Sequence, residues 1–85
     1  MQPVSKIASR LEETREALGL KAAALCRQAK ISPNAWSQFE SGERRITLQN
    51  AEKLCDTYGL TLDWIYRGDP AGLPQRVFEK ISTAA

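Results

Sequence analysis

The sequence predicts an all-α fold of five short helices followed by a C-terminal tail. Three observations support this prediction. Apolar residues recur at spacings of three and four, small polar residues stand where helices would begin, and glycines stand where they would end. No stretch alternates apolar and polar residues as a half-buried strand requires. With 85 residues, 42% of them hydrophobic and 26% charged, the chain suits one small globular domain.

The first two helices are predicted from an apolar stripe along each. One stripe runs over residues 5–18, and Gly19 ends this helix because glycine adopts the left-handed conformation at little cost. A second, shorter helix is predicted over residues 21–29. The inward-facing side chains expected in these two helices are Ile7, Leu11, Leu18, Leu25, Cys26 and Ala29.

The third helix, over residues 32–41, has the clearest start signal in the chain. Ser32 suits the N-cap, where its hydroxyl accepts a hydrogen bond from a free backbone N–H, and Pro33 suits the first helical position. Gly42 is expected to end this helix. Trp36 and Phe39 fall on its inner face.

The fourth and fifth helices are predicted by threonine caps. Thr47 begins a helix that Gly59 ends, and Thr61 begins a short one over residues 62–67. We therefore expect a domain over residues 1–68 and a tail over residues 69–85. In this tail, three apolar side chains have spacings that suit a further turn or two of helix: Val77, Phe78 and Ile81.

The residue inventory excludes several kinds of chemistry. The chain has no histidine and two cysteines, so we expect no catalytic residue, no metal site and no cofactor. Cys26 and Cys55 fall on apolar helix faces and are expected to be small core residues kept reduced in the cytoplasm. The longest apolar run, residues 22–26, is too short to span a membrane, and we expect no secretory signal.

The charges are unevenly distributed along the chain. The net charge of +2 comes from 12 basic and 10 acidic residues. Residues 1–45 hold 8 basic and 5 acidic side chains, a net of +3, whereas residues 46–85 hold 4 and 5, a net of −1. The basic excess in the first half weakly favours a nucleic-acid contact there.

Two short helices joined by a short link, over about residues 21–41, form the arrangement of a DNA-binding helix-turn-helix. Apolar anchors hold its second helix, and the outer face of that helix carries small polar residues. Asn34 and Gln38, one turn apart, are predicted to read bases, because each amide offers a donor and an acceptor that match adenine. Ser37 adds a hydrogen bond, and Pro33 suits a thymine methyl. The alternative is a merely solvated helix surface.

Backbone contacts to double-stranded DNA are expected where helix N-termini and basic side chains flank this face. The residues predicted to contact phosphates or the DNA backbone are Lys21, Ala22, Ser32, Ser41, Arg44 and Arg45. Arg15 and Glu40 are expected instead to form a structural salt bridge between the first and third helices.

The chain resembles the Cro/C1-type (XRE) family of helix-turn-helix regulators, which includes the N-terminal domains of lambdoid phage repressors. The segments that carry this resemblance are residues 15–20 (REALGL), 25–26 (LC), 31–32 (IS), 36–42 (WSQFESG), 44–45 (RR) and 58–64 (YGLTLDW). The resemblance implies a five-helix lambda-repressor-like domain that binds operator DNA as a two-fold dimer.

The chain departs from this family at the second helix and at the turn. Lys21 and Ala22 stand where the family usually has Ser or Thr followed by Gln. Lys30 stands at the usual turn glycine, so it must adopt a left-handed backbone, at a cost of about 1 kcal/mol, or use a different turn.

The resemblance also implies how the protein acts and assembles. It implies a transcriptional regulator, with repression as the preferred mode, and leaves open an antitoxin that neutralises a toxin and represses its own operon, or a restriction-modification controller. In such domains the fifth helix often forms the dimer contact. The candidates for that contact are Leu62, Trp64, Ile65, Tyr66, Val77 and Phe78, with Trp64 equally suited to the core.

Overall fold

The computed structural model describes residues 3–84, with the side chains of residues 3–81. This part of the chain contains six helices and no strand, which confirms the all-α prediction. The sixth helix lies in the predicted tail. The elements are α1 (Val4–Ala17), α2 (Ala22–Ala29), α3 (Pro33–Ser41), α4 (Leu48–Tyr58), η1 (Asp63–Arg67) and α5 (Gln75–Ala84).

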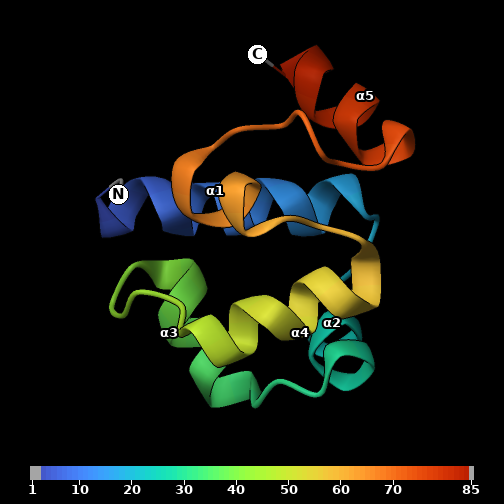
Figure 1. Ribbon diagram of the computed structural model, residues 1–85. Helices are drawn as coiled ribbons and strands as arrows, with labels where there is room; N and C mark the ends of the chain where they lie inside the picture. The colour runs from blue at the N-terminus through green and yellow to red at the C-terminus, as the bar shows by residue number, and fades with distance from the viewer. Residues whose placement is uncertain (1–2, 85) are drawn as a thin grey trace.

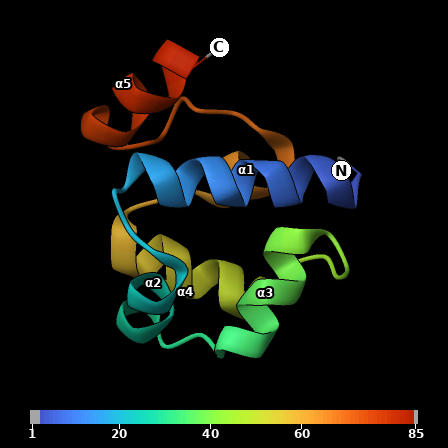
Figure 2. The same cartoon turned by 180° about the vertical axis from the view of Figure 1, so that it is seen from behind.

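Helix α1 lies in the middle of the molecule, with α5 on one side and α2, α3 and α4 on the other (Figures 1 and 2). It packs against α3, η1 and α5, so one core continues across both sides of this helix. The tail is therefore part of the same core as the preceding helices. The largest fully buried side chains of that core are Ile7, Leu25, Phe39, Leu54, Ile65 and Val77.

The predicted caps are present at three helix starts. The Ser32 hydroxyl accepts a hydrogen bond from the backbone N–H of Ala35 at 3.4 Å, and the Thr47 hydroxyl accepts one from Asn50 at 3.2 Å. The Thr61 hydroxyl accepts one from the Trp64 N–H at 3.0 Å. Each bond pairs a backbone donor that the first turn of a helix leaves free.

The turn between α2 and α3 takes the left-handed conformation at Lys30, with φ 60° and ψ 47°. Lys30 is the one non-glycine residue with positive φ in the described part of the chain. The Lys53 ammonium donates a hydrogen bond to the Lys30 carbonyl oxygen at 2.9 Å, which ties the turn to α4. The turn is thus made without a glycine, and Lys30 bears the strain of the left-handed backbone.

Replacing Lys30 by glycine is expected to raise the free energy of unfolding by about 0.5–1 kcal/mol, since relief of left-handed strain outweighs the extra freedom of the unfolded chain. The Lys53 contact is to a backbone oxygen and is kept. Urea unfolding measures the change. Lys30→Ala is the matched control, because it also removes the exposed side chain but keeps the Cβ atom. If Lys30→Gly and Lys30→Ala had equal free energies of unfolding, the left-handed backbone at this residue would not be strained.

Hydrogen bonds and a cation–π contact fasten η1 to α1. The Trp64 indole N–H donates to the Thr14 hydroxyl at 2.9 Å, and the Arg10 guanidinium lies 5.5 Å from the centre of the Trp64 ring. Arg10 also donates to the carbonyl oxygen of Ile65 at 3.0 Å. Burial lowers the pKa of Arg10, and the carboxylate of Glu13 opposes this effect. The wide π-helical turn of η1 thus lays its aromatic side chain on α1.

This packing corrects part of the expected dimer contact. Trp64, Ile65 and Val77 are 5%, 1% and 0% exposed and fill the core of the chain itself, because η1 and α5 close over α1. Tyr66 is half-buried and donates its hydroxyl hydrogen to the Ile46 carbonyl oxygen at 2.7 Å. The large apolar side chains left exposed in the described residues are Leu48, Leu62 and Phe78.

Both cysteines have free thiols. Cys26 is buried where α2 and α3 approach each other, and Cys55 is half-buried on α4. Burial raises the pKa of both thiols, and neighbouring carboxylates, among them Glu40 for Cys26 and Asp56 for Cys55, raise it further. Both thiols are therefore protonated near neutral pH and have little nucleophilic character.

Candidate nucleic-acid interface

Helices α2 and α3 are held together by buried anchors. Ile31, Trp36 and Phe39 are 3%, 2% and 1% exposed, and Cys26 is small enough to lie between the two helices. Because Trp36 and Phe39 occupy the inner face of α3, the residues between and beside them are turned outward. Figure 2 shows α2 and α3 next to each other on one side of the molecule.

The outer face of α3 carries the residues predicted to read bases. Pro33, Asn34 and Ser37 are exposed, and Gln38 is half-buried at the edge of this face. The face is polar and free of bulky apolar side chains, as contact with base edges in a major groove requires. We call it the reading face, defined as Pro33, Asn34, Ser37 and Gln38.

A surface groove of about 630 Å³ lies between α1, α2 and α3. Its walls include Ala22 at the start of α2, and Pro33, Ser37 and Ser41 of α3. The structure therefore brings two of the four residues predicted to read bases onto one concave surface with two of those predicted to contact the backbone, whereas Asn34 and Gln38 do not line this groove. Glu12 of α1 also lines this groove and adds a negative charge that the sequence analysis did not anticipate.

The start of α2 has the features expected of a phosphate contact. Lys21 and Ala22 are exposed, and the Lys21 side chain makes no capping hydrogen bond. The backbone N–H groups of this first turn therefore lack a capping side chain, and the helix dipole adds positive potential. By contrast, Ser32 caps α3, and the Ser41 hydroxyl bonds locally, donating to the Gln38 carbonyl oxygen at 3.2 Å.

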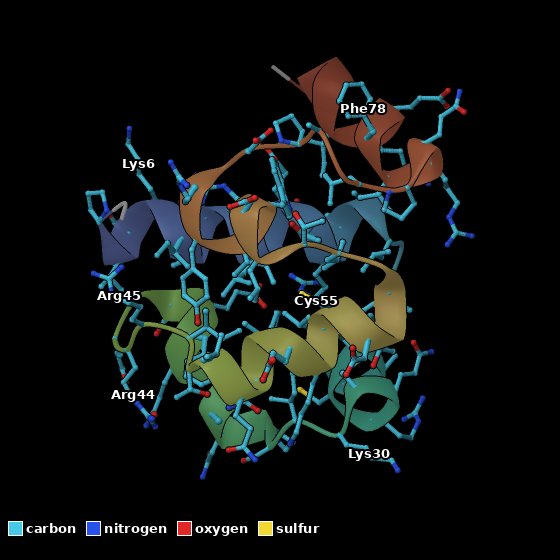
Figure 3. All side chains as sticks on the ribbon, viewed as in Figure 1. Lys6, Lys30, Arg44, Arg45, Cys55 and Phe78 are labelled. Atoms are coloured by element: carbon cyan, nitrogen blue, oxygen red, sulfur yellow. The ribbon has the colours of Figure 1, made fainter. Side chains whose placement is uncertain are left out.

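The two arginines after α3 differ in their surroundings. Figure 3 shows Arg44 and Arg45 leaving this loop in different directions. Arg44 returns to α3, where its NH1 group donates to Gln38 Oε1 at 2.9 Å. Arg45 lies near Tyr66, where its positive charge opposes the rise that burial causes in the pKa of that phenol. Sequence reasoning missed the Arg44 contact, since it depends on how the chain reverses at Gly42.

Arg15 and Glu40 form the predicted salt bridge between α1 and α3. The Arg15 NH2 group lies 2.9 Å from Glu40 Oε1, and the pair is mostly shielded, with side chains 18% and 16% exposed. Arg15 also donates to the Leu20 carbonyl oxygen at 2.9 Å, a contact that the sequence did not indicate. The hydrogen bond to Glu40 raises the pKa of Arg15. This bridge holds the C-terminal end of α3 against α1.

The interface offers hydrogen-bond donors, acceptors and positive charge.

In the described part of the chain, no three acidic or cysteine side chains are grouped so that they could hold a metal ion. No helix among residues 3–84 is long and apolar enough to cross a membrane.

The paired short helices, their buried anchors and the exposed polar face of α3 define a helix-turn-helix domain. The model of the helix-turn-helix domain family matches residues 6–64, and the chain belongs to this family. Searches of curated proteins and of solved structures found no match.

Proposed function

We propose that this protein is a sequence-specific transcriptional regulator of the Cro/C1 type that represses by occupying an operator. The observation that carries the proposal is the reading face, exposed and polar on a helix whose opposite side is fixed by Trp36 and Phe39. Amide side chains at helical spacing on such a face match base edges in the major groove.

Docking on the duplex would come from the flanks of the reading face. Lys21 and the uncapped start of α2 supply charge and N–H groups on one flank, and Arg45 supplies charge on the other. Contacts of this kind hold a helix in register without reading sequence. Because the usual phosphate-binding glutamine of α2 is absent, these groups carry a larger share of the docking.

We propose a two-fold dimer as the binding form, with residues 1–68 as the DNA-binding unit and the tail as an extension of it. Leu62 and Phe78, 37% and 39% exposed, are the predicted contact residues that keep apolar surface. Leu48, 57% exposed at the start of α4, is a further candidate that the sequence analysis did not name.

Selecting sites from a random DNA pool with the full chain tests this function. We expect an inverted repeat whose half-site centres lie about 10 base pairs apart, or a multiple of that, since two reading helices must enter the same face of the duplex. Sedimentation of the complex should then give two chains per site. Recovery of sequences with no common motif would contradict sequence-specific recognition.

A further inference from the structure

Gln38 and Arg44 form one unit at the edge of the reading face. Besides the side-chain bond of 2.9 Å from Arg44 NH1 to Gln38 Oε1, the Arg44 backbone N–H donates to the Gln38 carbonyl oxygen at 3.1 Å. Arg44 is therefore held to Gln38 by both its main chain and its side chain.

The Phe39 ring also fixes the position of the Arg44 guanidinium. Its carbon lies 5.5 Å from the centre of the Phe39 ring, and Phe39 is 1% exposed, so the ring is a rigid platform. Gly42, with φ +87°, reverses the chain and brings residue 44 back over the end of α3. Little side-chain freedom is lost when such an ordered pair meets a ligand.

This pairing changes which base Gln38 would favour. A free glutamine amide offers one acceptor and donors next to it, which matches the N6 and N7 edge of adenine. In the pair, one lone pair of the acceptor Oε1 receives a bond from Arg44, so the pair as a whole offers an excess of donors, namely the amide N–H groups and the guanidinium N–H groups that this bond does not use. The positive charge also repels the amino groups of adenine and cytosine.

Guanine presents the complementary edge, since its O6 and N7 atoms are both acceptors. We infer that Arg44 is a specificity-determining residue that makes Gln38 select guanine instead of adenine in the half-site. This inference rests on the proposed DNA-binding function. It differs from a phosphate contact by Arg44, because loss of a phosphate contact weakens binding to all sequences alike.

The test is a set of site selections with the full-length wild type and the variants Gln38→Ala, Arg44→Ala and Arg45→Ala. The position whose base preference Gln38→Ala abolishes is the one that Gln38 reads. We expect guanine there for the wild type and adenine for Arg44→Ala, with the ratio of guanine to adenine binding changing by about tenfold or more. Arg45→Ala, the matched loss of charge in the same loop, should weaken binding to all sequences alike and keep the preference for guanine.

A modified operator gives a second measurement. Replacing that guanine by 7-deazaguanine removes the N7 acceptor, and it should weaken wild-type binding by about tenfold while leaving Gln38→Ala unaffected. Selection of adenine by the wild type, or equal weakening of all sequences by Arg44→Ala, would overturn the inference and leave the proposed function intact. Recovery of no motif by the wild type would instead reject the function, and the inference with it.

Discussion

Replacing Phe39 by alanine is expected to lower the free energy of unfolding by about 3–5 kcal/mol, the range for truncation of a buried aromatic side chain. Phe39 is among the largest fully buried residues of the core and is 1% exposed. Its loss would leave a cavity behind the reading face and remove the platform under Arg44. Since a domain of 85 residues is stable by roughly 4–13 kcal/mol, this loss amounts to at least about a quarter of the total stability.

Urea unfolding followed by circular dichroism measures this effect. Ser37→Ala on the exposed side of the same helix is the control, and we expect it to change stability by less than about 0.5 kcal/mol. Phe39→Leu should recover much of the loss, because it refills most of the cavity. A destabilisation by Phe39→Ala below about 1 kcal/mol would show that the ring contributes little packing.

The helices were predictable because their signals are local. Ser32 and Thr47 cap through hydrogen bonds to N–H groups three residues away, and Gly42 takes the left-handed backbone that ends α3. Such interactions depend on a few neighbouring residues, which the sequence displays directly. The sequence also predicted that Lys30 must be left-handed if the turn is kept, and the structure has this conformation.

The burial of the last helices depended on long-range packing. The apolar residues of the tail suit a helix, but whether that helix covers α1 or a second chain depends on the distant surface it meets. The structure places Val77 in the core at 0% exposure. Trp64 is fixed in the same way by its bond to Thr14, 50 residues earlier in the chain. The spacing of residues within η1 and α5 does not indicate that Trp64 bonds to Thr14 or that Val77 is buried in the core.

The reading face was predictable as a set of residues, whereas its electrostatics was not. The positions of Trp36 and Phe39 determine which side of α3 faces outward, because helical geometry follows from spacing. The bond between Gln38 and Arg44 crosses the end of the helix and depends on the path of the loop. The base preference proposed for Gln38 therefore depends on a neighbour that the sequence pattern had placed among the DNA-backbone contacts.

The combined substitution Asn34→Ala and Gln38→Ala is expected to reduce strongly the preference for the selected operator. Each good base contact contributes about 1–3 kcal/mol of discrimination, so losing two should reduce the preference for the operator over random DNA by about 30-fold or more in each half-site. Asn34 is exposed and Gln38 is half-buried at the edge of its face, so the fold should persist. Fluorescence anisotropy with operator and random duplexes at one fixed salt concentration measures both affinities.

The matched control is Gln75→Ala, which also removes a glutamine amide but lies, exposed, on α5, on the other side of α1 from α3. Its preference for the operator should equal that of the wild type. Binding of the double variant to random DNA should change little, because Lys21, Arg45 and the start of α2 are the groups proposed to supply the sequence-independent attraction. A double variant that keeps the wild-type ratio of operator to random binding would show that α3 does not read the bases, and recognition would have to be assigned to another surface.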